Sequence, residues 1–191
     1  MSSSPQRRLP HDWFSQPLPT SVELGERTWL YSSYALLHYQ SRAAVGLRVG
    51  HDTGIYHGAH FELGPDAEVR IGDYCTLIGT IFATNGTVSV GDYAFVAHEV
   101  VFADSDWPLP PHNDRAAPAD ARSAGRCHIE VGENVWIGAQ AILIGNVRIG
   151  EGAIIGAGTL VTQDVPPLTI CAGNPMRVMR TIPRGDVAAP R

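Results

Sequence analysis

The chain has 191 residues, enough for one domain with a sizeable core, and 44% of them are hydrophobic while only 17% are charged. A formal charge of −5 without a lysine- or arginine-rich segment argues against a nucleic-acid partner, and no run is apolar enough for a signal peptide or a membrane span. The three cysteines, Cys75, Cys127 and Cys171, have no CxxC spacing, so we expect a reduced, cytoplasmic protein.

In chain order, residues 1–23 come first and show no repeat, so we expect an N-terminal extension that is partly disordered. The stretch WLYSSYALLHYQSRAAVG follows soon after and holds three tyrosines and a tryptophan. Composition assigns no role to these aromatic residues.

From residue 24 to 165 the main feature is a six-residue repeat. It is plainest in VGENVWIGAQAILIGNVRIGEGAIIGAGTLVT, where every sixth residue is apolar and glycine often follows it. Helical side chains six positions apart do not share a face, so the period indicates short strands separated by tight turns. Eighteen apolar anchors follow, three to a coil: Leu24, Leu30, Leu36; Val49, Ile55, Phe61; Ile71, Leu77, Ala83; Val90, Val96, Phe102; Val131, Ile137, Leu143; and Ile149, Ile155, Val161.

The repeat predicts an all-β fold, a parallel β-helix of about six triangular coils over residues 24–165. Its longest interruption, residues 103–130, contains four prolines and is too long for a plain connection, so it is expected to form a protruding loop. Residues 166–191 are expected to be a closing segment and tail with a short C-terminal helix.

The repeat resembles that of the hexapeptide-repeat acyltransferases. The segment VTQDVPPLTICAGNPMRVMRTI, in particular, is similar to the closing segment of the galactoside and maltose acetyltransferases. The resemblance implies a left-handed β-helix and a homotrimer with active sites between subunits. It also implies an acyltransferase that uses acetyl-CoA or another acyl-CoA as co-substrate, with no metal.

Stacking at ~4.8 Å per coil places equivalent residues in columns. Two residues past the second anchor of each coil lie Ser32, His57, Gly79, His98, Ala139 and Ala157. The resemblance implies coenzyme contacts at Ala139, Ala157 and Thr162. It also implies phosphate contacts at Arg177 and Arg180, which one helical turn would bring to the same side.

The catalytic base is the next question. In galactoside-type enzymes it is a histidine in a THP segment, and Trp107 stands at that position here. The segment VAHEV instead resembles the motif of the lipid A pathway and amino-sugar acyltransferases, whose histidine lies two residues past an anchor. This similarity makes His98 the predicted general base, because histidine exchanges protons near neutral pH. The Ala139 N–H is the predicted oxyanion donor.

Further residues are expected around this base. Glu99, Asp104 and Asp106 are candidates for orienting the His98 ring. His57, Trp107 and His112 are predicted to contact the acceptor, and His112 is the alternative base. The acceptor is expected to be a hydroxyl or amine of a small molecule.

Two other interpretations stay open. The γ-class carbonic anhydrases share the β-helix but need three histidines around zinc, including a pair five residues apart, whereas His57 and His60 are three apart. A binding or scaffold protein could keep the fold without catalysis, since Trp107 replaces the histidine of the galactoside-type loop.

Overall fold

The computed structural model describes residues 7–104 and 127–183. In these ranges the chain forms short β-strands and one 3-10 helix, η1 (Ser33–Leu36). The strands are β1 (Val22–Leu24), β2 (Trp29–Leu30), β3 (Leu47–Val49), β4 (Gly54–Ile55), β5 (His60–Leu63), β6 (Glu68–Ile71), β7 (Thr76–Leu77), β8 (Ile81–Thr84), β9 (Thr87–Val90), β10 (Phe95–Val96), β11 (Val101–Ala103), β12 (His128–Val131), β13 (Trp136–Ile137), β14 (Ile142–Ile144), β15 (Val147–Ile149), β16 (Ile154–Ile155), β17 (Leu160–Val161), β18 (Thr169–Ala172) and β19 (Arg177–Thr181). Over the same ranges, no helix is long and apolar enough to cross a membrane.

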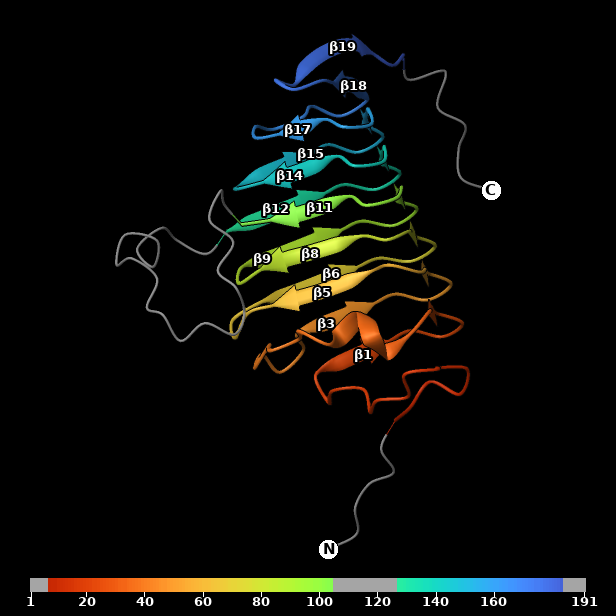
Figure 1. The fold of residues 1–191 in the computed structure, drawn as a ribbon. Helices are drawn as coiled ribbons and strands as arrows, with labels where there is room; N and C mark the ends of the chain where they lie inside the picture. Colours follow the sequence, from red (N-terminus) through yellow and green to blue (C-terminus); the bar gives the residue numbers. More distant parts are fainter. Residues whose placement is uncertain (1–6, 105–126, 184–191) are drawn as a thin grey trace, which may run out of the picture.

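The strands build three sheets around a common axis. Successive strands of one coil enter the first, then the second, then the third sheet, and Figure 1 shows the coils stacked as rungs of one solenoid. The first sheet holds β1, β3, β6, β9, β12 and β15; the second β2, β4, β7, β10, β13, β16, β18 and β19; the third β5, β8, β11, β14 and β17. All pairs are parallel except β18 with β19. The predicted three-sided β-solenoid of about six coils is confirmed.

The interior is a column of the predicted anchors, and all of them are buried except Leu24 and Ala83. In the third sheet, Phe61, Phe82 and Phe102 stack directly, with ring centroids 5.0 and 4.8 Å apart and nearly parallel planes. These rings exclude water along the axis and hold successive coils in register.

The anchor predicted at Ala83 is wrong by one residue. Phe82 pairs with Phe61 and Phe102 and is fully buried, while Ala83 lies on the outer side. Side chains alternate along a strand, so burying the much larger phenylalanine forces alanine outward. The turn between Leu77 and Phe82 is therefore one residue shorter than the equivalent turn of the neighbouring coils.

The lower end of the solenoid is covered by residues 7–21. The Arg7 guanidinium donates to the Val22 carbonyl at 2.7 Å, and the Leu18 N–H donates to the Arg7 carbonyl at 2.9 Å. Leu9 and Leu18 pack against the core. The segment thus shields the first coil, as terminal caps of repeat proteins do.

The predicted C-terminal helix is wrong, because residues 177–181 form β19. This strand pairs antiparallel with β18, after a turn in which Gly173 has a φ of +100°. The last coil leaves unpaired N–H and C=O groups on β18, which a returning strand satisfies and a helix would not. Val178 and Thr181 are also β-branched residues that favour a strand.

The three outer faces differ in character. The first sheet is charged outside, with ion pairs such as Arg48–Glu23 at 2.8 Å and Arg148–Glu130 at 2.7 Å. The outer side chains of the second sheet include Trp29, Phe95, Trp136 and Ile154, and those of the third include Ile81, Val101 and Ile142. The corner between the second and third sheets is therefore flanked by apolar surface on both sides.

Candidate active site

The predicted site residues gather where the chain passes from the second sheet to the third, a region we call the His98 corner. One residue of each of the second to sixth coils has left-handed backbone there: Gly58 (φ 83°), Gly79 (59°), Glu99 (58°), Gln140 (60°) and Gly158 (65°). In the coils of full length, the residues just before them are His57, His98, Ala139 and Ala157. Register therefore stacks these four residues along the corner, as the sequence predicted.

Gly79 does not belong to that column, contrary to the prediction. It takes the left-handed position, and a Cβ built on it would lie 3.4 Å from the Glu99 nitrogen and 3.6 Å from the His57 carbonyl oxygen. The cause is the short turn of the third coil. The residue before Gly79 is Ile78, whose carbonyl accepts from the Glu99 N–H at 3.3 Å, so a half-buried isoleucine stands between His57 and His98 in that coil.

His98 is exposed, and its backbone is fixed. Its carbonyl accepts from the Gln140 N–H at 2.8 Å. The Gln140 side-chain amide donates to the Glu99 carboxylate at 2.9 Å, so Glu99 turns toward the next coil. The imidazole of His98 makes no hydrogen bond with another residue that the structure describes, which leaves both ring nitrogens available.

The other acids predicted to orient His98 are not beside it. Asp104 accepts from the Thr84 hydroxyl and from the Asn85 N–H at 2.5 Å, which commits its carboxylate to the end of β8. Asp106, Trp107 and His112 lie outside the described residues.

Ala139 and Ala157 occupy the two coils beyond His98. The Ala139 carbonyl accepts from the Gly158 N–H at 2.8 Å. The Ala139 N–H has no partner within the described ranges, and a methyl side chain leaves that group approachable. An unpaired N–H beside an exposed imidazole can stabilise an oxyanion.

Arg177 and Arg180 lie on the same face because of a bulged strand, and not because of the helical turn that the sequence suggested. Arg177 pairs with Ala172 and Arg180 with Ile170, and a bulge on β19 absorbs the extra residue, Met179. Directly opposed residues point to the same side of a sheet, so both guanidinium groups lie on the outer face of the second sheet. Thr162, which follows β17, is exposed on the third sheet in an adjacent coil.

A pocket of about 340 Å³ lies at the lower end of the same corner, and we call it the first-coil pocket. It is lined by Trp13, Tyr31, Tyr34 and residues 57–60. Of these residues, only His57 was predicted from the sequence to contact the acceptor, and its ring meets that of Tyr31 edge-on at 5.3 Å. The tyrosine-rich stretch that contains Tyr31 and Tyr34 was the sequence signal for this pocket. The contact of Tyr34 with Trp13 forms only in the folded chain, so the sequence did not show it.

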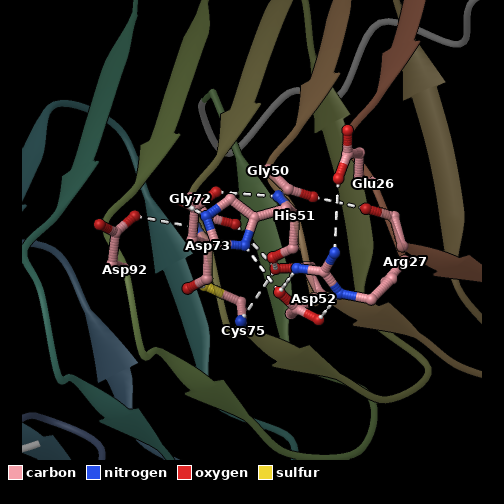
Figure 2. A network of polar contacts seen from close by, with 11 residues as sticks. Glu26, Arg27, Gly50, His51, Asp52, Gly72, Asp73, Cys75 and Asp92 are labelled. Carbon is pink, nitrogen blue, oxygen red and sulfur yellow. Dashed lines mark hydrogen bonds and ion pairs between the residues drawn. The ribbon is translucent and has the colours of Figure 1, made fainter.

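The opposite corner, between the first and second sheets, holds a dense polar network (Figure 2) that we call the His51 corner. The His51 ring lies between two carboxylates, with Nδ1 2.8 Å from Asp52 and Nε2 2.8 Å from Asp73. Arg27 makes two hydrogen bonds to Asp52, at 2.6 and 2.5 Å. Hydrogen bonds from Arg27 and then from His51 lower the pKa of Asp52 to about 2. Every charged group here already has a partner.

Neither corner assembles a metal centre from the residues described. Within residues 7–104 and 127–183 of one chain, no group of three His, Cys, Asp or Glu side chains lies close enough together to hold a metal ion.

The thiols are equally poor candidates for chemistry. Burial raises the pKa of Cys75 to about 11 and, together with Asp104, that of Cys127 to about 12, and burial also raises the pKa of Cys171. A thiol that stays protonated at neutral pH is a weak nucleophile.

Residues 128–163 match the bacterial transferase hexapeptide family (six repeats). The chain is 31% identical over 134 residues to the galactoside O-acetyltransferase of Escherichia coli, which covers 70% of this chain and 63% of that protein. It is 30% identical over 144 residues to the galactoside O-acetyltransferase of Lactococcus lactis, covering 74% of this chain and 56% of that protein. The chain thus spans less than two thirds of the length of these relatives.

Two solved structures share the fold. A variant of AntD, an N-acyltransferase from Bacillus cereus in complex with dTDP and coenzyme A, has a TM-score of 0.65 at 20% identity, with 85% of each chain covered. A hexapeptide-repeat acetyltransferase from Vibrio cholerae, complexed with acetyl coenzyme A, has a TM-score of 0.52 at 20% identity, covering 84% of this chain and 71% of that one.

Proposed function

The chain belongs to the hexapeptide-repeat acetyltransferase family, and we propose that it transfers an acetyl group from acetyl-CoA to a hydroxyl or amine of a small molecule. The observation that carries the proposal is the His98 corner. There an exposed imidazole without a partner among the described residues stacks below the free N–H of Ala139.

His98 acts as the general base, and the acetyl group passes directly from the thioester to the acceptor. It takes the proton from the acceptor while the acceptor oxygen or nitrogen attacks the thioester carbonyl carbon. The Ala139 N–H donates to the oxyanion that forms. When the C–S bond breaks, the proton on His98 passes to the leaving thiolate, which restores the imidazole.

Coenzyme binding along the same corner is the next part of the proposal. Ala139 and Ala157 carry only methyl groups, so the pantetheine arm can run close to the backbone there. Arg177 and Arg180 bind phosphates on the outer face of the second sheet, because guanidinium groups suit phosphate oxygens. The coenzyme in the AntD and Vibrio cholerae structures supports this assignment by analogy.

We further propose a homotrimer of left-handed solenoids with the His98 corners between subunits. The apolar outer faces of the second and third sheets support this arrangement, since isolated subunits would expose Trp29, Phe95, Trp136 and Ile142 to water. We infer a cytoplasmic location because the three cysteines are free thiols.

The first experiment is a calorimetric titration with acetyl-CoA, repeated with Arg180→Ala and with Arg70→Ala. Arg180→Ala should weaken binding about tenfold, the loss of one charge-assisted contact. Arg70 lies on the charged first sheet beside Glu68 and serves as the control that should bind normally.

Analytical ultracentrifugation of the same samples measures the oligomeric state. A folded trimer that does not bind acetyl-CoA would refute the acetyltransferase. A protein that binds acetyl-CoA but releases no thiol with any acceptor would be a binding protein.

A further inference from the structure

One wall of the first-coil pocket comes from residues 7–21, a segment that precedes the repeat. Trp13 belongs to residues 7–21, and its ring packs against Tyr34 of η1 with centroids 5.7 Å apart. Phe14 meets the same tyrosine edge-on at 5.2 Å. Trp13 nevertheless remains 69% exposed, so most of its surface is free for a ligand.

Asp12 fixes this segment against η1. Its carboxylate accepts from the Ser32 hydroxyl at 2.7 Å, from the Ser33 N–H at 2.7 Å, from the Ser33 hydroxyl, and from the Phe14 N–H at 3.0 Å. Ser32 also caps η1 by accepting from the Tyr34 N–H. One carboxylate thus holds both the Trp13 wall and the Tyr34 wall of the pocket.

The lining favours an uncharged ring. Three aromatic rings and two imidazoles line the pocket, and none of its described lining residues is Asp, Glu, Lys or Arg. Aromatic walls gain contact energy from a flat or apolar ring face, while the histidines and tyrosines offer hydrogen bonds at the rim.

The position of the pocket sets the distance that a ligand must span to reach His98. Its upper wall, residues 57–60, lies in the second coil, and His98 lies in the fourth, which is roughly 10 Å away at two strand spacings. Between His57 and His98 the third coil places only the half-buried Ile78 and the buried Gly79, and neither carries a charged or polar side chain. A ligand can therefore lie across these two residues and contact both ends.

We propose that the first-coil pocket holds an uncharged ring of the acyl acceptor, with the group acylated at His98 roughly 10 Å from that ring. The inference rests on the proposed function and narrows the acceptor to an elongated molecule. Trp13 and Tyr34 select the ring, and Asp12 is a positioning residue that holds them.

The test uses two series of probes, ω-phenylalkylamines and ω-phenylalkanols of increasing spacer length, with thiol release from acetyl-CoA as the readout. Benzylamine cannot reach from the pocket to His98, so kcat/KM should rise with spacer length to an optimum. Trp13→Ala should lower kcat/KM of the best probe about three- to tenfold, the size of one lost aromatic contact. It should leave the KM for acetyl-CoA unchanged.

Asp12→Asn should lower kcat/KM of the long probe by a similar factor. The matched control is Tyr74→Ala, which removes an exposed aromatic ring at the His51 corner, outside the pocket and away from the proposed subunit interface. A rate that is independent of spacer length, or a Trp13→Ala variant with wild-type kcat/KM, would overturn the inference.

Ring binding is also measured without turnover, by saturation-transfer NMR of the phenyl group. If no probe is acetylated, phenyl saturation that disappears in Trp13→Ala would support the pocket while the proposed function failed. The absence of phenyl saturation in the wild-type protein would refute the pocket whatever the enzyme activity.

Discussion

The His51 and His98 corners are built on the same backbone device and use it for different purposes. In both, all coils but the first at the His98 corner turn through a residue with left-handed backbone. At the His51 corner most of these residues carry large or charged side chains: Arg27, Asp52, Tyr74, Tyr93 and Asn134. At the His98 corner three of the five are glycines.

The side chains of the His51 corner are paired with one another. Tyr74 stacks on Tyr93 at 4.9 Å, His51 bridges two carboxylates, and the Asp73 N–H donates to Asp92 at 2.8 Å. A histidine in that setting has no ring nitrogen left for a substrate. His98 has both, so reactivity in this fold depends on which corner leaves its groups unpaired.

The largest expected effect comes from removing the unpaired histidine, His98. His98→Ala should lower kcat about 100- to 10,000-fold, the usual contribution of a general base, without changing Tm, because the ring makes no contact that the fold needs. Steady-state thiol release and a thermal melt measure the two quantities.

His51→Ala is the matched control and should do the reverse. It breaks two carboxylate contacts and leaves Asp52 and Asp73 facing each other, so Tm should fall while kcat stays within about twofold of wild type. If both histidine variants lost activity equally, the comparison of the corners would be wrong.

The solenoid was predictable because its signal is repeated. Anchors such as Val96 and Ile137 recur at a fixed period, and one face of every strand must be buried, so errors at one coil do not spread to others. The error at Ala83 arose where Phe82 offered a larger side chain one position earlier.

The site was only partly predictable, because its parts come together in three dimensions. The stacking of His98, Ala139 and Ala157 followed from the period. The first-coil pocket did not, since Trp13 precedes the repeat and reaches Tyr34 through contacts of Asp12. The strand that carries Arg177 and Arg180 was likewise mistaken for a helix, because short sequence spacing fits both a helical turn and a bulged strand.

Gly79→Ala tests the left-handed turn of the third coil. A Cβ there meets its neighbours only at ordinary contact distances, so the cost comes from the φ of +59° and should be about 1–2 kcal/mol in the free energy of unfolding. Gly79→Asn should cost less, because asparagine tolerates left-handed backbone better than alanine does. Urea melts give the stabilities, and equal costs for the two variants would contradict this account.

A smaller effect concerns the Asp12 carboxylate that holds the Trp13 segment. Burial raises its pKa, but hydrogen bonds from Ser33, Ser32 and Phe14 outweigh burial and lower the pKa to about 2, well below the usual value of an aspartate. A lowered pKa means that the stabilisation is present above about pH 4 and is lost as the pH falls toward 2. The Phe14 and Ser33 amide NMR signals should therefore shift with a midpoint near pH 2, and Asp12→Asn should abolish this titration. A midpoint near pH 4 would show that the carboxylate is not held.

The smallest effect is expected at the exposed rim of the His51 corner. Arg27 binds Asp52 with good geometry, yet its side chain is 63% exposed, and such pairs gain little because water competes for both charges. Arg27→Ala should leave Tm nearly unchanged and should raise the pKa of Asp52 from about 2 only part of the way, since the His51 hydrogen bond remains. Carboxyl-carbon NMR titration of Asp52 measures this shift. A large fall in Tm would instead mean that the network depends on Arg27. The stability of this corner would then not come mainly from the Tyr74–Tyr93 stack and from His51 between its two carboxylates.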